Sequence, residues 1–169
     1  TPDTPFSCIT PFRVEGVPIR CHKYGGHGTA AFRRQLQQSC NPTLIQVAQL
    51  IGKENFYKYF EAFGYSSTTG IDLPAEAAPI YHAYSGFNAV ELATYSFGQT
   101  FKITPIQQIT AISTVANGGY LISPHVVSRV VDKDGNVIFS ADENPRRQVV
   151  SSEVCSTLAD ILEEGVSTD

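Results

Sequence analysis

Apolar residues recur at helical spacing in five stretches of the chain, each with a capping residue or a glycine at an end. This periodicity predicts amphipathic helices, because one face of a helix recurs every three or four positions. Asn41-Pro42 and Thr104-Pro105 each combine a capping residue with a proline at the first helical position, where a missing N–H costs nothing. The expected helices cover about residues 29–38, 41–51, 54–63, 105–117 and a last one from 151 or 152 onward.

Four of these helices carry apolar faces that we expect to be buried. The helix after Asn41 is apolar on most sides. The next helix has an aromatic stripe formed by Phe56, Tyr59, Phe60 and Phe63. The inward face of the helix after Thr104 would consist of Ile106, Ile109, Ile112, Val115 and Ala116. That of the last helix would consist of Val154, Leu158, Ile161 and Leu162, with Cys155 as a core thiol.

The remaining segments are predicted to be loops and hairpins. Residues 1–28 contain proline and glycine breaks without a helical period, so we expect an irregular region with a short hairpin near Glu15-Gly16. Residues 66–88 lack any period. Valine-rich runs around Asp134-Gly135-Asn136 predict a β-hairpin over residues 125–140. The order of elements indicates a helix-dominated α+β fold in one domain, with parts 1–28, 29–119 and 120–169.

Composition excludes several classes of protein. The chain is 42% hydrophobic and 17% charged, which is typical of a globular domain with one core. The net charge is −4 and no concentrated basic run occurs, so we expect no nucleic-acid binding. No apolar run reaches the length of a membrane span and no signal peptide is visible.

Three groups of short motifs follow one another along the chain. The first runs from Gly26-His27-Gly28-Thr29 to Ser39-Cys40-Asn41. The second joins Phe63-Gly64-Tyr65 to Thr69-Gly70-Ile71-Asp72-Leu73-Pro74. The third joins Ser96-Phe97-Gly98-Gln99 to Thr104-Pro105-Ile106-Gln107 and ends at Ala116-Asn117-Gly118-Gly119. Their order and spacing resemble the transpeptidase domain of class B penicillin-binding proteins, of the elongation or sporulation-specific type.

The resemblance implies the helix-dominated part of the β-lactamase/transpeptidase-like fold, without most of its central sheet. It also implies a D,D-transpeptidase that cross-links peptidoglycan through an acyl-serine. Ser39 would be the serine of the Ser-x-Asn motif and relay a proton toward the leaving amine, while Asn41 would hydrogen-bond the substrate amide carbonyl. Gly98 and Gln99 would lie next to the substrate. From the residues alone, Ser39 and Asn41 could be helix caps, and we expect Asn41 to serve both purposes.

The other two motifs of the family are absent from the sequence. None of the five lysines follows a serine by three positions or precedes Thr-Gly or Ser-Gly, so Ser-x-x-Lys and Lys-Thr-Gly are missing. The resemblance places the first motif before residue 1 and the third after a segment that begins near Thr168. We therefore expect an internal part of a longer enzyme that is inactive alone. The alternative is a non-catalytic, metal-stabilised assembly module of the cell-wall synthesis machinery.

The resemblance also implies a location and partners. The parent enzyme would act at the extracytoplasmic face of the bacterial membrane, anchored through a segment outside this chain. It would bind peptidoglycan stem peptides and β-lactams and contact other cell-wall synthesis proteins. Helix faces that the missing strands would cover predict self-association of this chain. Catalysis by this family needs no cofactor.

Three of the four cysteines, Cys8, Cys21 and Cys40, fall within the first 40 residues, and His27 lies between the last two. Three thiolates and one imidazole would complete a tetrahedral structural zinc site. A loop region with little core would gain from such a metal, and some elongation-type relatives hold a metal between this loop and the middle residue of Ser-x-Asn. Two alternatives stay open: a disulfide, which persists outside the cytoplasm, or buried free thiols. His22 could replace His27 as a ligand.

Overall fold

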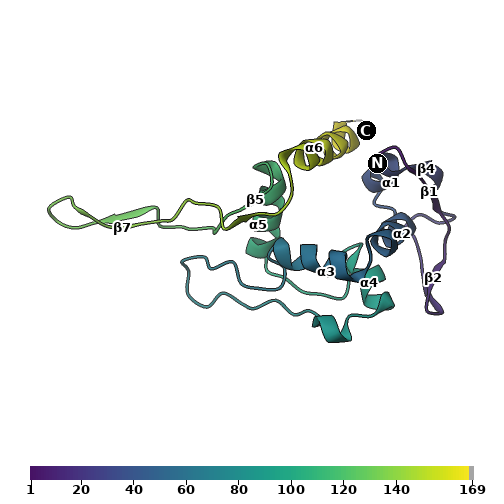
Figure 1. Ribbon diagram of the computed structural model, residues 1–169, viewed down its shortest axis with the longest axis horizontal. Coiled ribbons are helices and arrows are strands. Elements are labelled where there is room, and N and C mark those ends of the chain that lie inside the picture. Colours follow the sequence, from purple (N-terminus) through teal and green to yellow (C-terminus); the bar gives the residue numbers. More distant parts are fainter. Residues whose placement is uncertain (168–169) are drawn as a thin grey trace. The chain divides into compact units, whose positions relative to one another are not determined.

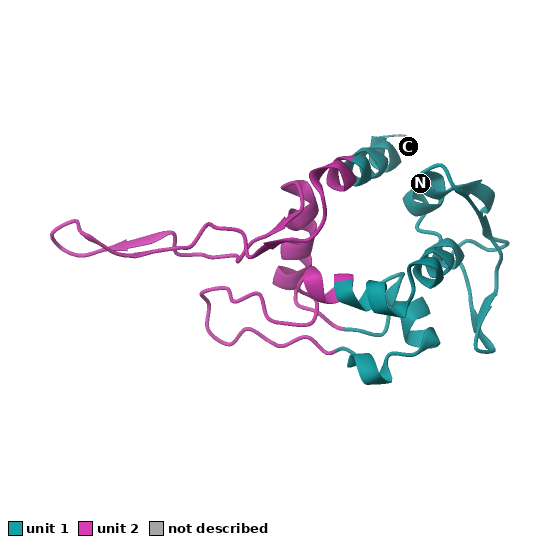
Figure 2. Cartoon of the chain, in the orientation of Figure 1, with its two compact units in different colours: residues 1–58, 81–101, 157–169 teal, residues 59–80, 102–156 magenta. Residues whose placement is uncertain are grey.

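The computed structural model describes residues 1–167, and Thr168, where the segment toward the third motif was expected to begin, lies outside them. The chain divides into two compact units (Figure 2). The first consists of residues 1–58, 81–101 and 157–169, and the second of residues 59–80 and 102–156. Two helices, α3 (Lys53–Ala62) and α6 (Ser152–Ser167), each pass from one unit to the other.

The first unit begins with two antiparallel strand pairs. Strand β1 (Pro5–Cys8) pairs with β4 (Gly28–Ala31), and β2 (Phe12–Val14) forms a hairpin with β3 (Val17–Ile19). The hairpin confirms the turn predicted at Glu15-Gly16. The predicted helix at 29–38 was wrong in its first part, because the backbone of residues 28–31 bonds to β1. Only α1 (Phe32–Gln37) is helical there.

Three further helical segments belong to the first unit. They are α2 (Asn41–Ile51), the short 3₁₀ helix η1 (Tyr84–Gly86) and α4 (Ala89–Tyr95), and Figure 1 labels two of them, α2 and α4. Sequence periodicity did not reveal α4, which has only seven residues and begins with a capping box between Asn88 and Glu91. The core consists of Val14, Ile45 and Ala93, with Phe12, Ile19, Val90 and Phe97 packed against it.

The second unit contains α5 (Pro105–Ala116), two strand pairs and the start of α6. Strand β5 (Tyr120–Leu121) pairs with β8 (Arg147–Gln148), and β6 (Arg129–Val131) pairs with β7 (Val137–Ser140). The predicted capping at Thr104 and the predicted hairpin are confirmed. Every sheet among the described residues has two strands, so helices dominate, as expected.

The predicted inward face of α5 was wrong. Ile109 and Ile112 are 52% and 51% exposed, whereas Gln107, Thr110 and Thr114 are buried. Hydrogen bonds explain this orientation. The Gln107 amide donates to the Ser67 carbonyl at 2.6 Å, and the Thr114 hydroxyl donates to the Thr110 carbonyl at 3.0 Å. The buried side chains of Gln107 and Thr114 therefore keep hydrogen-bond partners.

Two other predicted apolar faces are narrower than expected. Tyr59 in α3 and Val154 and Leu162 in α6 are exposed. In α6 the buried positions are Cys155 and Ile161, so the prediction of Cys155 as a core thiol is confirmed. Because one helix face contacts its neighbours along a single line of positions, residues one step to either side stay in solvent.

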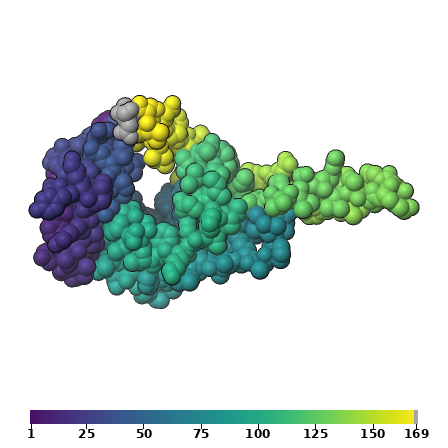
Figure 3. All heavy atoms as spheres, turned by 180° about the vertical axis from the view of Figure 1, so that it is seen from behind, coloured from purple at the N-terminus to yellow at the C-terminus, as the bar shows by residue number. Residues whose placement is uncertain are grey.

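The β6–β7 hairpin projects from the rest of the second unit (Figure 3). Its apolar side chains are exposed on both strands, with Ile138 66% exposed. At its base, the Asp72 carboxylate accepts hydrogen bonds from the backbone N–H groups of Val126 and Val127 at 2.7 and 2.8 Å. At its tip, Asp132 accepts from the N–H groups of Asp134 and Asn136. The β6–β7 hairpin is thus held by hydrogen bonds at both ends, although the residues of its strands are exposed.

None of the described helices combines the length and the apolar character needed to cross a lipid bilayer.

Candidate functional site

The four predicted metal ligands meet in the first unit. One ligand atom from each of Cys8, Cys21, His27 and Cys40 lies within 4.8 Å of the others. Cys8 ends β1, and the β1–β4 pairing places it opposite Gly28, next to His27. Cys21 follows β3, and Cys40 immediately precedes α2. The three cysteines are buried together, so segments distant in sequence converge on one small cluster.

The backbone around this cluster is shaped to bring the ligands close. Gly26 has a φ of +81°, and a Cβ added there would lie 2.6 Å from the Cys8 carbonyl oxygen and 3.1 Å from its Sγ. Only glycine therefore allows this approach. The backbone N–H of Cys21 donates to the Thr10 hydroxyl at 3.0 Å, which fixes the Cys21 segment.

Gln35 supports the cluster, and sequence reasoning did not identify it. Its fully buried amide donates to the Phe6 carbonyl at 3.2 Å and to the Gly28 carbonyl at 3.0 Å. These bonds join the two strands that bring Cys8 and His27 together. The only available signal was a glutamine among the apolar positions of a predicted helix.

Burial shifts the pKa values of two of these residues, Cys8 and His27. It raises the pKa of the Cys8 thiol to about 12, with further contributions from Cys40 and Cys21. Burial also lowers the pKa of His27, assisted by the nearby charges of His22 and Lys23. A neutral imidazole is the form that binds a metal. A cation in the cluster would oppose the raised pKa of Cys8 and favour its thiolate.

The donor set and its geometry fit a metal ion. Tetrahedral zinc bonds of about 2.3 Å to sulfur place the donors roughly 3.7 Å apart. The Cys21 Sγ lies 3.3 Å from His27 Nδ1 but 3.9 Å from His22 Nδ1. His22 is also exposed, so His27 is the better-placed imidazole. The four residues could therefore hold a metal ion with no movement larger than about one ångström.

The Ser39-Cys40-Asn41 motif lies directly beside this cluster. Ser39 is exposed and has a φ of +49°, a left-handed conformation that is rare outside glycine and often found at functional sites. Cys40 is fully buried. Asn41 donates from Nδ2 to the Arg20 carbonyl at 3.1 Å. The motif thus has a buried middle residue between two polar neighbours.

The prediction that Asn41 caps a helix was wrong. The N-cap of α2 is Cys40, without a side-chain capping bond, and Asn41 is already the first helical residue. The Asn41 amide is used instead to hold the segment that leads to Cys21. This bond links the Ser-x-Asn motif to the segment that carries Cys21.

Gly98 and Gln99 form a tight turn after α4. Their N–H groups donate to the Tyr95 carbonyl at 3.0 Å and the Thr94 carbonyl at 2.9 Å. Both residues are exposed. Phe97, just before them, packs on the core that includes Ile45 of α2. No bond found within residues 1–167 joins this turn to Ser39, so a substrate-adjacent role stays a prediction.

Comparison with known proteins identifies the family. A model of the penicillin binding protein transpeptidase domain matches residues 7–169. Stage V sporulation protein D of Bacillus subtilis is 36% identical over 155 residues, which cover 91% of this chain and 24% of that protein. The peptidoglycan D,D-transpeptidase MrdA of Salmonella typhimurium is 27% identical over 138 residues, covering 75% of this chain and 22% of that protein.

Solved structures show the same fold. Penicillin binding protein 3 from Mycobacterium tuberculosis, in complex with aztreonam, superposes with a TM-score of 0.91 at 23% identity, covering 100% of this chain and 38% of that one. A putative peptidoglycan glycosyltransferase from Atopobium parvulum gives a TM-score of 0.86 at 27% identity, covering 99% and 38%.

These matches cover nearly the whole chain and agree with the motifs and the α+β architecture. The chain belongs to the transpeptidase domain family of class B penicillin-binding proteins. The expected family and fold class are confirmed. The chain spans about a quarter of the length of the curated relatives described above.

Proposed function

We propose that this chain is the part of a D,D-transpeptidase that carries the Ser-x-Asn motif of the active site. The parent enzyme would cross-link peptidoglycan through an acyl-serine and bind β-lactams at the same serine. The observation that carries this proposal is the geometry at residues 39–41. An exposed serine in a strained conformation and a fixed asparagine flank a fully buried cysteine.

Each of the two polar residues has a role in acyl transfer. The Ser39 hydroxyl can pass a proton toward the leaving amine, because it combines a donor and an acceptor and is exposed. Asn41 presents an amide whose orientation is set by the Arg20 carbonyl. The acylated serine itself would come from a Ser-x-x-Lys motif, which this sequence lacks. We therefore expect no penicillin labelling of the chain alone.

Cys8, Cys21, His27 and Cys40 bind a structural zinc ion under this proposal. The metal would hold the three thiolates and the imidazole together, and with four protein ligands it would leave no position for a reactive water. Cys40 belongs to both the ligand set and the Ser-x-Asn motif. The ligand cluster thus orients Ser39 and Asn41.

The parent enzyme would lie at the extracytoplasmic face of the membrane, among other cell-wall synthesis proteins. One observation favours the alternative of a non-catalytic assembly module, namely the exposed apolar side chains of the β6–β7 hairpin. The same side chains, together with Ile109 and Ile112, support self-association of the isolated chain.

Fluorescent penicillin labelling of the full-length protein tests the catalytic role. Ser39→Ala is expected to slow acylation by about 10²- to 10⁴-fold, the usual contribution of positioned proton transfer. Ser85→Ala is the matched control, because Ser85 is an exposed serine in η1 of the same unit. Acylation of Ser39→Ala at the wild-type rate would rule out the proposed role. A wild-type protein that does not label would favour the assembly module.

Elemental analysis with a thiol count tests the metal site on chelator-washed protein. We expect one zinc per chain, lost in Cys8→Ser and retained in Cys155→Ser, which removes a buried cysteine outside the cluster. Two thiols lost without metal would indicate a disulfide. All thiols free without metal would leave the cluster as ordinary buried residues.

A further inference from the structure

Helix α1 is too short to hold its own position. It has six residues, no side-chain N-cap and no acidic residue in its first turn. Helices of this length are not stable in water without tertiary contacts. Its first N–H groups are satisfied from outside, since Phe32 donates to the Thr4 carbonyl and Arg33 to the Pro2 carbonyl, both at 2.8 Å.

The end of α1 sets the position of the Ser-x-Asn motif. The N–H of Ser39 donates to the Leu36 carbonyl at 2.9 Å, and the N–H of Cys40 donates to the Gln35 carbonyl at 3.0 Å. Carbonyl groups of the last turn of α1 therefore hold the backbone of Ser39 and Cys40 in place. A shift of this turn would move the Ser39 hydroxyl with it.

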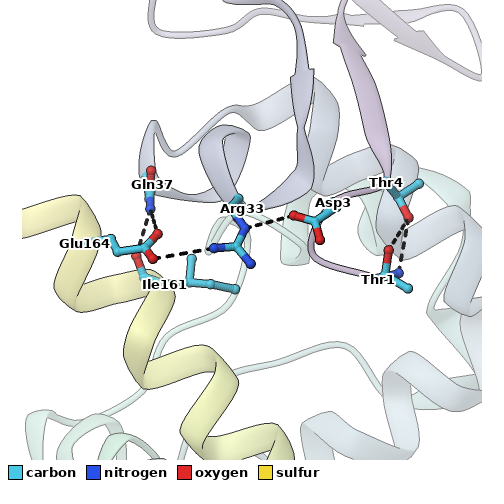
Figure 4. A network of polar contacts seen from close by, with 7 residues as sticks. All are labelled: Thr1, Asp3, Thr4, Arg33, Gln37, Ile161 and Glu164. Carbon is cyan, nitrogen blue, oxygen red and sulfur yellow. Dashed lines mark hydrogen bonds and ion pairs between the residues drawn. The ribbon is translucent and has the colours of Figure 1, made fainter.

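The last turns of α6 lie against this end of α1 (Figure 4). The Gln37 amide donates to the Ile161 carbonyl at 3.1 Å and to the Glu164 carboxylate at 3.2 Å. Arg33 reaches Glu164 at 3.5 Å and Asp3 at 3.1 Å. Gln37 is thus the residue that ties the last turn of α1 to α6.

A glycine inside α6 makes the close approach feasible. A Cβ added at Gly165 would lie 3.0 Å from Gln37 Cγ and 3.3 Å from its Cβ. Glycine within a helix is less favourable than alanine. Helix formation alone does not favour glycine at this position, whereas the contact with Gln37 does.

We propose that Gln37 is a positioning residue for Ser39, held by the last turns of α6 through the Ile161 carbonyl and the Glu164 carboxylate. The proposal rests on the role of Ser39 given above. Gln37 would act through the last turn of α1, two residues before the serine. Displacement of a catalytic group by about one ångström can slow a reaction by roughly 10²-fold.

The test compares three variants of the full-length protein. Gln37→Met keeps the length of the side chain but removes the donor, and we expect acylation by fluorescent penicillin to slow by about 10-fold or more. Gln38→Met is the matched control, because no bond from the Gln38 side chain to α6 is found among residues 1–167. Gln37→Lys retains a donor for the same two acceptors and should restore most of the rate.

Two readouts separate positioning from general stability. The acylation rate constant of folded molecules should fall in Gln37→Met, with zinc content and thermal midpoint close to those of Gln38→Met. Hydrogen exchange of the Ser39 and Cys40 amides should also speed up in Gln37→Met alone. Equal rate constants and equal exchange in the two methionine variants would overturn the proposal. If wild-type protein does not label, the catalytic proposal fails, and amide exchange still decides whether α6 positions Ser39.

Discussion

Gly26→Ala is the most discriminating substitution for the ligand cluster, because Gly25 offers a nearly identical control. Gly25 and Gly26 have φ values of +79° and +81°. Alanine at either position therefore has about the same backbone strain, roughly 1–2 kcal/mol. A Cβ at Gly25 meets nothing within 4 Å, whereas a Cβ at Gly26 lies 2.6 Å from the Cys8 carbonyl oxygen. The difference between the two variants isolates the contact with Cys8.

The contact with Cys8 should destabilise Gly26→Ala by roughly 1–3 kcal/mol more than Gly25→Ala, which is the usual cost of forcing extra atoms into a packed region. The backbone must move to relieve it, and the movement separates Cys8 from His27. We expect zinc affinity to fall about 5- to 150-fold more in Gly26→Ala than in Gly25→Ala, since 1.4 kcal/mol is tenfold in an equilibrium constant.

Competition with a chromogenic chelator measures the affinity, and a thermal melt with and without chelator measures the coupling to stability. Gly26→Ala should melt roughly 2–9 °C below Gly25→Ala when zinc is present, with a smaller gap after chelation. Equal zinc affinities in the two variants would refute the reasoning, because the close approach to Cys8 would then have no effect on the ligands. If the difference in melting temperature is the same with and without chelator, the contact affects packing alone.

Three further predictions concern the second unit. The N–H groups of Val127 and Val126 lower the pKa of Asp72, so its bonds to the base of the hairpin persist above about pH 4 and are lost as pH falls through the folded pKa. The amide chemical shifts of Val126 and Val127 should therefore titrate together, and Asp72→Asn should abolish that titration. Ile138→Thr should reduce self-association of the isolated chain in sedimentation, because Ile138 is 66% exposed. Arg147→Lys should destabilise the unit by about 1 kcal/mol, seen as a lower thermal midpoint, because the guanidinium donates to two carbonyls at the end of α3.

Local signals in the sequence were sufficient for elements whose ends are marked by side chains. The helix after residue 40 follows from its proline, and the helix after residue 104 from its cap and its proline. The turn at Glu15-Gly16 and the hairpin around Gly135 follow from turn residues. Residue type in the sequence predicted Cys8, Cys21, His27 and Cys40 as candidate ligands, and the structure brings them together. The roles of Ser39 and Asn41 came from the family resemblance and stay predictions. Chemistry of this kind depends on residue type more than on packing.

Only the tertiary structure decided which faces are buried and what supports the site. The pairing of β4 with β1 replaced the first part of the expected helix, residues 29–31, because strand hydrogen bonds come from a distant segment. The inward side of α5 is largely polar, with Ala111 among its buried residues, and Gln107 finds its partner 40 residues away. Gln35 and Gln37 became visible as supports only through bonds to β1, β4 and α6. Periodicity reports the polarity of a helix face, but the partners that satisfy a buried polar group are set by long-range contacts.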